Sequence, residues 1–115
     1  MKKLFLFCTI FLLTGCQVVD QMTGLAAIEQ KKTADKALAQ VKCQELCQVE
    51  MADGKDLNLG PCLSNKIIND WVCDVAHNPR ETIDNKKENQ CSAFSTGQAH
   101  HFVEVDGNCN LINTN

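Results

Sequence analysis

The sequence predicts an α+β fold: one long N-terminal helix packed on a small, disulfide-linked head with a short antiparallel β-meander. Two observations support this prediction. Residues 25–51 consist mainly of strong helix formers and contain neither Pro nor Gly. Residues 55–115, here called the head, combine short apolar runs with turn residues and both prolines of the chain.

The N-terminus has the organisation of an export signal. Lys2 and Lys3 provide a positive start, and residues 4–13 are almost wholly apolar, at about half the length that spans a bilayer. The next residues, Leu13-Thr14-Gly15-Cys16, resemble the lipobox of bacterial lipoproteins. The resemblance covers residues 1–17 and implies that residues 1–15 are removed as a signal peptide. It also implies that the Cys16 sulfur receives diacylglycerol and the freed amine a further acyl chain such as palmitate. An ordinary secretory peptide and an uncleaved anchor are the alternatives.

The resemblance places the mature chain in the cell envelope, attached to the membrane through lipid on Cys16. In a Gram-negative cell, Gln17 after this cysteine indicates the outer membrane. Residues 16–24 are then a lipidated tether and residues 25–115 a single small Cys-rich domain. Removal of Lys2 and Lys3 leaves 9 basic side chains against 14 acidic ones, a net charge near −5. This balance argues against nucleic acid as a partner.

The long helix is predicted over residues 25–51, and Asp53-Gly54 provides a stop signal. Its first half is polar, which we interpret as a solvated stalk; a coiled-coil partner is the alternative, although no sustained heptad is present. Its second half carries the apolar residues expected to pack: Leu38, Val41, Leu46 and Val49, with Cys43 and Cys47.

The head begins with a turn at Gly60-Pro61. Ser64 can then cap a short helix through Trp71 and Val72, or residues 71–76 can form a strand. Residues 78–90 contain Pro79 and many charged side chains, and they predict a long exposed loop. Two hairpins follow: residues 92–94 pair with 100–105, and 100–105 pair with 109–112.

The cysteines predict a disulfide framework. Cys8 leaves with the signal peptide, and besides Cys16 six remain, an even number that favours three bridges in a small exported domain: Cys43, Cys47, Cys62, Cys73, Cys91 and Cys109. Cβ atoms one helical turn apart lie roughly 5–6 Å from each other, whereas a disulfide needs about 3.5–4.5 Å. Cys43 and Cys47 are therefore expected to pair with two later segments. Metal binding and redox chemistry are weaker alternatives, because Cys-x-x-Cys is absent.

The sequence carries no recognised catalytic motif, and it predicts neither an enzyme nor a cofactor. The favoured function is a non-catalytic envelope lipoprotein that acts as a protein-binding or structural module on a membrane surface. His77 and Arg80, beside the predicted loop, are the candidate contact residues with an envelope protein. The alternative is a lipoprotein that binds a metal or small ligand through His77, His100 or His101.

Overall fold

A computed structural model describes the backbone of residues 19–115 and the side chains from Gly24 onward. The predicted signal peptide and the lipidation of Cys16 lie outside these residues. Within the described part of the chain, no helix is both long enough and apolar enough to cross a membrane.

Helix α1 runs over Val19–Ala52, so it begins before the predicted residue 25 and includes part of the predicted tether. The chain divides into two compact units between Thr33 and Ala34, inside this helix, rather than forming one unit from residue 25. The side chains of residues 24–34 are exposed, including Leu25 and Ile28. This part of the helix buries almost no apolar surface, which accounts for the later start of the second unit.

The predicted stop signal ends α1 as expected. Gly54 adopts a left-handed conformation (φ 86°), which costs glycine little. Its N–H donates to the carbonyl of Met51 at 3.1 Å, and the N–H of Lys55 donates to the carbonyl of Glu50 at 3.0 Å. These two bonds form a Schellman motif, which satisfies carbonyls that the helix end would leave unpaired.

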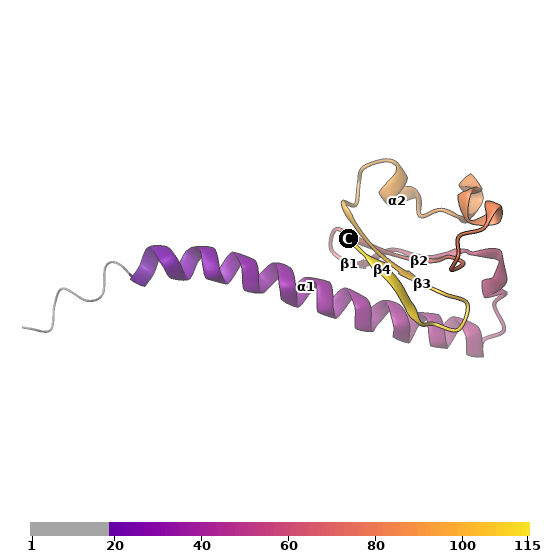
Figure 1. Ribbon diagram of the computed structural model, residues 1–115, viewed down its shortest axis with the longest axis horizontal. Coiled ribbons are helices and arrows are strands. Elements are labelled where there is room, and N and C mark those ends of the chain that lie inside the picture. The colour runs from indigo at the N-terminus through magenta and orange to yellow at the C-terminus, as the bar shows by residue number, and fades with distance from the viewer. Residues whose placement is uncertain (1–18) are drawn as a thin grey trace, which may run out of the picture. The chain divides into compact units, whose positions relative to one another are not determined.

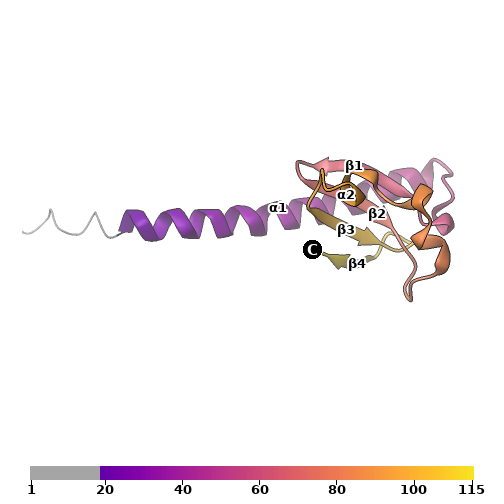
Figure 2. The ribbon, with the colours of Figure 1, turned by 90° about the horizontal axis from the view of Figure 1, so that it is seen from above.

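Four strands form one sheet in the order β1 (Cys62–Ile68), β2 (Trp71–Val75), β3 (His101–Val105) and β4 (Leu111–Thr114) (Figure 2). The short helix predicted to begin at Ser64 is wrong, and the alternative strand at residues 71–76 is confirmed as β2. Apolar residues spaced at one, three and four positions fit a short helix, but here the turn at Asp70 (φ 71°) lets Trp71 pair with Ile68.

The sheet is mixed, so the predicted antiparallel meander is wrong at its centre. Strands β2 and β3 are parallel, because residues 92–95 form the short helix α2 (Ser92–Ser95) and not a hairpin strand. The connection between these strands also contains the 3-10 helices η2 (Thr82–Asn85) and η3 (Lys87–Asn89). Part of the predicted loop is therefore helical. This crossover returns the chain to the start of β2, as parallel pairing requires. The β3–β4 hairpin is confirmed.

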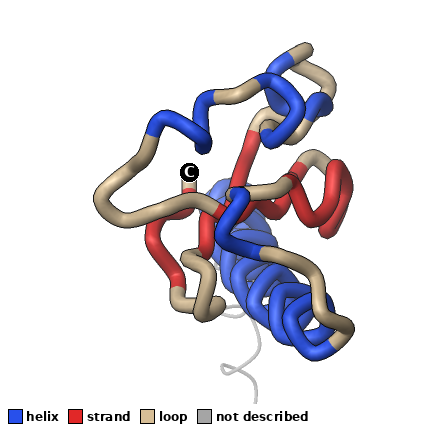
Figure 3. The backbone as a smooth tube through the Cα atoms, turned by 90° about the vertical axis from the view of Figure 1, so that its right-hand side faces the viewer, coloured by secondary structure: helices blue, strands red, loops and turns tan. Residues whose placement is uncertain are grey.

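The two faces of the sheet carry different layers (Figures 1 and 3). On one face, the part of α1 from Ala34 onward packs on β2 and β3 through a core that includes Ala39, Val75, Val103 and Val105. On the other face, Val72 packs beneath the crossover with Cys91, Ala93 and Ala99. Helix α2 and the 3-10 helices lie on this second face, opposite α1 (Figure 3).

Residues 19–115 contain three disulfides, as predicted: Cys43–Cys73, Cys47–Cys109 and Cys62–Cys91. The first two join one side of α1 to β2 and to the β3–β4 turn, which confirms that the two helical cysteines pair with later segments. The third joins β1 to the residue before α2. Each bridge contributes about 2–4 kcal/mol, comparable with a large part of the stability of a small domain.

The packed side of α1 contains the predicted Cys43 and Cys47, but of the larger apolar residues predicted to pack, Leu46 is half-buried and the other three are exposed. Ala39, Cys43 and Cys47 recur every four residues, so they share one face, and all three are fully buried. Leu38, Val41 and Val49 point elsewhere and are 46%, 52% and 55% exposed. The two disulfides determine which side of the helix faces the sheet, so the larger apolar residues remain at the surface.

Candidate functional site

Two carboxylates occupy paired positions in the parallel strands at the centre of the sheet. Asp74 of β2 lies opposite Glu104 of β3, just as Val72 lies opposite Phe102. Residues two apart along a strand share a face, so all four lie on the face away from α1. There they contribute to a pocket of about 310 Å³, here called the carboxylate pocket, whose lining is Val72, Asp74, Arg80, Gln90, Cys91, Phe94, Ser95, Phe102 and Glu104.

Asp74 is the most perturbed ionisable group of the pocket. Its Oδ1 atom is buried and has no hydrogen-bond partner. Burial raises the pKa of Asp74 to about 7, and the neighbouring negative charge of Glu104 acts in the same direction. Near neutral pH this carboxyl group therefore exists in comparable amounts with and without its proton.

Glu104 is held by an ion pair. Its Oε2 atom lies 3.0 Å from Nη1 of Arg80, and its side chain is 15% exposed. The Arg80 guanidinium also donates from Nε to the side-chain oxygen of Asn85 at 2.8 Å and from Nη2 to the backbone carbonyl of Asp84 at 3.3 Å. Arg80 thus neutralises one of the two carboxylates and is anchored to η2.

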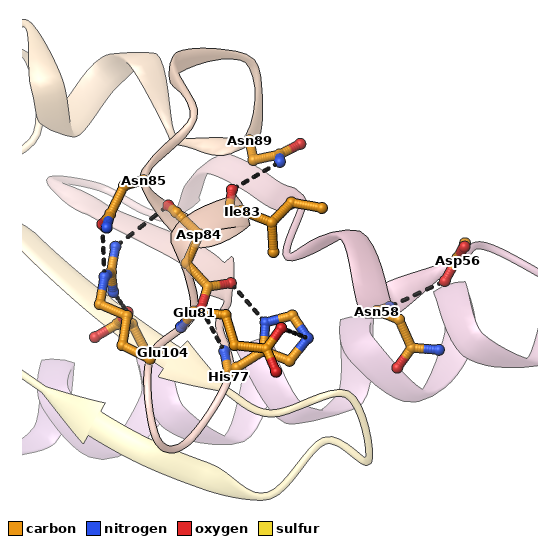
Figure 4. Close-up of polar contacts among 10 residues, drawn as sticks. Asp56, Asn58, His77, Glu81, Ile83, Asp84, Asn85, Asn89 and Glu104 are labelled. Atoms are coloured by element: carbon orange, nitrogen blue, oxygen red, sulfur yellow. Dashed lines mark hydrogen bonds and ion pairs between the residues drawn. The ribbon is translucent and has the colours of Figure 1, made fainter.

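His77 and Asp84 form a second polar cluster, which also includes Glu81 (Figure 4). The Asp84 side chain is nearly fully buried and accepts hydrogen bonds from the backbone N–H groups of His77 and Glu81, at 3.0 and 2.9 Å. Nδ1 of His77 lies 2.9 Å from Asp84 Oδ1, and its Nε2 lies 3.4 Å from a carboxylate oxygen of Glu81. Gly60 packs so closely that a Cβ atom there would clash with Asp84.

The pKa values of His77 and Asp84 shift in opposite directions. The hydrogen bond that the His77 ring donates to Asp84 raises the pKa of His77 above its ordinary value, and the charges of Asp84 and Glu81 add to this effect. Burial alone would raise the pKa of Asp84, but the hydrogen bonds from the Glu81 and His77 backbones and from the His77 ring lower it below 3.8. The pair therefore favours a charged imidazolium beside a charged carboxylate.

The apolar wall of the carboxylate pocket consists mainly of Phe94 and Phe102. Their rings meet edge to face with centroids 5.2 Å apart. Phe94, on α2, is 42% exposed, whereas Phe102 is partly buried against the second core. The Cys62–Cys91 disulfide joins β1 to the segment that leads into α2, which restrains this wall.

The other two histidines lie at the opposite end of the strands. His100 pairs with Asp70 at 2.7 Å, and His101 lies 3.7 Å from Asp70 and stacks on Trp71 with ring centroids 4.6 Å apart. His77 follows the end of β2, whereas His101 begins β3, and the strand between separates these positions by roughly 13 Å or more. The structure therefore does not bring His77 together with His100 or His101. Among the residues that the structure describes, no group of three His, Cys, Asp or Glu is placed to hold a metal ion.

The sequence indicated part of this site and missed the rest. Arg80 lines the pocket and His77 lies in the adjoining cluster, so these two predicted residues are brought close to each other. Asp74, Glu104, Phe94 and Phe102 were not predicted. A signal was present: each central strand is an apolar run interrupted at its fourth position by an acidic residue, in Trp-Val-Cys-Asp-Val and His-Phe-Val-Glu-Val.

Geometrically, the carboxylate pocket offers an apolar wall, one neutralised carboxylate and one carboxyl group that can gain or lose a proton near neutral pH. Such a combination suits the binding of a small group that is partly apolar and partly polar. Comparison of the chain with protein-family models, curated proteins and solved structures found no match.

Proposed function

We propose that this protein is a lipid-anchored lipoprotein of the cell envelope whose disulfide-linked domain is a non-catalytic binding module for a partner protein. The carboxylate pocket and its rim are the proposed contact site. The observation that carries this proposal is the exposed Phe94 ring, packed on Phe102 beside the Arg80–Glu104 ion pair. Aromatic and Arg side chains at a pocket rim are typical of the residues that dominate binding at interfaces.

The proposed anchor depends on the lipobox resemblance of Leu13-Thr14-Gly15-Cys16. The exposed residues 24–34 support the further proposal that this part of α1 separates the lipid from the binding domain. In a Gram-negative cell the proposed location is the outer membrane.

The pocket chemistry supports binding over catalysis. The Ser95 hydroxyl, the candidate oxygen nucleophile of the lining, donates to the backbone carbonyl of Ser92 at 3.1 Å and not to a base. Cys91 forms a disulfide bond, and Glu104 forms an ion pair with Arg80. These contacts leave no activated hydroxyl or thiol nucleophile in the pocket lining.

Binding of a small ligand is the second candidate function, because the pocket volume of about 310 Å³ lies at the lower end of ordinary ligand sites. This candidate uses the carboxylate pocket and not the histidines, since His77 and the His100–His101 pair occupy opposite ends of the strands.

The test is photo-crosslinking in the membrane. A photoreactive phenylalanine analogue is placed at Phe94 of the full-length protein in its native cells, with Leu59 as the matched control. Leu59 is similarly exposed (49%) but lies outside the pocket lining. We expect a discrete protein adduct from position 94 and none from position 59. Equal labelling from both positions, or none from 94, would overturn the proposal.

A further inference from the structure

We infer that the carboxylate pocket recognises a protonated primary amine, carried on a lysine side chain of a partner or on a small free amine, between Asp74 and Glu104 and against the Phe94–Phe102 wall. The inference deepens the proposed function and depends on it, because it names the chemistry that the same pocket binds.

The first support is the unequal pairing of the two carboxylates. The Arg80 guanidinium forms an ion pair with Glu104. Its other N–H groups donate hydrogen bonds to the Asn85 side chain and to the backbone carbonyl of Asp84. Asp74 keeps a buried oxygen with no donor. Buried polar atoms are almost always hydrogen-bonded, and an ammonium group supplies three donors together with the missing positive charge.

The second support is the shape and character of the pocket. A volume of about 310 Å³ suits a single side chain or a small amine and not an extended ligand. The Phe94 and Phe102 rings can contact a methylene chain, and an aromatic face also attracts a cation. An alkylammonium group uses both parts of the pocket at once, because its stem is apolar and its head is charged.

The charges in the pocket disfavour an anionic ligand. Among the lining residues, Arg80 is the single cation, and it already forms an ion pair with Glu104. A carboxylate or phosphate would therefore meet both Asp74 and Glu104 without a free positive partner. A neutral carbonyl could accept a hydrogen bond from protonated Asp74, and this alternative is distinguished by its pH dependence.

Amine binding should be coupled to the ionisation of Asp74. The charged groups that act on Asp74 are Glu104 of β3, Arg80 after β2 and Asp84 of η2; the α2 residues of the lining, Phe94 and Ser95, do not titrate. An ammonium binds the ionised form of Asp74, which becomes scarcer below its pKa of about 7. The apparent Kd should rise about tenfold per pH unit below 7 and level off above it.

The test is calorimetric titration of the full-length lipidated protein in detergent with four probes. Nα-acetyl-lysine amide represents a partner side chain, and phenethylamine represents a free amine. Nα-acetyl-norleucine amide lacks the ammonium group, and acetone offers only a neutral carbonyl. We expect at least one amine to bind at pH 8, to bind about 30-fold more weakly at pH 5.5, and to outcompete both neutral probes.

Asp74→Asn is the decisive variant because it keeps the shape of the side chain and removes its charge. It should weaken amine binding at pH 8 at least tenfold and abolish the pH dependence. Asp53→Asn is the matched control: it makes the same chemical change at the exposed end of α1 and should leave binding unchanged. Circular dichroism and intact mass verify the fold and the disulfides of both variants.

The outcomes separate the two proposals. Binding of the lysine probe alone indicates a partner side chain, and binding of phenethylamine alone indicates a small amine; both support the inference. Norleucine binding as tight as lysine, tighter binding at low pH, or full binding by Asp74→Asn overturns it. If no amine binds while position 94 still crosslinks to a protein, the inference fails and the proposed function stands.

Discussion

Asp74 and Glu104 lie side by side on the parallel strands β2 and β3, yet Arg80 holds only Glu104. The charge of Glu104 is thereby neutralised, whereas Asp74 is partly buried, with one buried, unpaired oxygen and a pKa raised to about 7. This inequality gives the pocket a carboxyl group that changes its charge near neutral pH. It also makes Asp74 a source of instability whenever it is ionised.

Asp74→Asn should therefore stabilise the protein at high pH. The folded pKa of Asp74 lies above its ordinary value of 3.8, so protonation favours the folded state at low pH. That advantage is lost as pH rises from about 4 through 7, by on the order of 2–4 kcal/mol. Urea unfolding of oxidised protein should show Asp74→Asn as more stable than the wild type at pH 8 and equal to it, or less stable, at pH 4. A loss of stability at pH 8 would contradict this account.

Asp84→Ala should destabilise the domain by about 1–3 kcal/mol, because the partly buried backbone N–H groups of His77 and Glu81 lose their acceptor. The exposed Glu88→Ala in the same crossover serves as the control and should change the free energy of unfolding by less than about 0.5 kcal/mol. Chemical denaturation at pH 6 measures both. Equal effects of the two substitutions would show that Asp84 has no special structural role.

The His77–Asp84 pair should stabilise the fold within a limited pH window. The raised pKa of His77 means that its contribution is fully present below 6.5 and is lost as pH rises through the folded value. The lowered pKa of Asp84 means that its contribution is present above 3.8 and is lost as pH falls through the folded value. NMR titration of the His77 ring should give a pKa above that of a model peptide, and Asp84→Asn should lower it. A His77 pKa that Asp84→Asn leaves unchanged refutes the coupling.

The three bridges should differ in their effect on stability. Cys47 and Cys109 are 62 residues apart, whereas Cys62 and Cys91 are 29 apart. If restriction of the unfolded chain dominates, replacing the first pair by Ala should cost roughly 0.6 kcal/mol more than replacing the second. Denaturant unfolding of the two double variants measures the difference. Before these variants are compared, thiol titration of the denatured, unreduced wild type should establish that the bridges are formed. We expect fewer than two reactive thiols per chain.

Cys16→Ser should abolish lipidation, because only the cysteine sulfur can form the thioether that the lipobox resemblance implies. The intact mass and the detergent partitioning of the Ser variant are compared with those of the wild type. A wild type without acyl mass, or a Ser variant that still carries lipid, would show that the N-terminal segment is not a lipoprotein signal.

The sequence alone determined the features that depend on neighbouring residues. Helix propensity and the Gly54 stop predicted the long helix and its end, and the turn residues 106–108 predicted the β3–β4 hairpin, whereas the sequence left open whether a strand or a helix follows Asp70. The distance between helical positions also excluded a Cys43–Cys47 bridge. Each of these signals acts over a few residues, so it can be evaluated without the remaining chain.

Only the tertiary structure decided which distant residues meet. The β2–β3 crossover could have returned as a hairpin or as a parallel connection, and the parallel path is what places Asp74 beside Glu104. The choice of Cys73 and Cys109 as disulfide partners turned one side of α1 to the sheet and left Leu38 and Val41 in solvent. These outcomes depend on the packing of the whole domain, because contacts between segments far apart in sequence leave no periodic pattern in either segment.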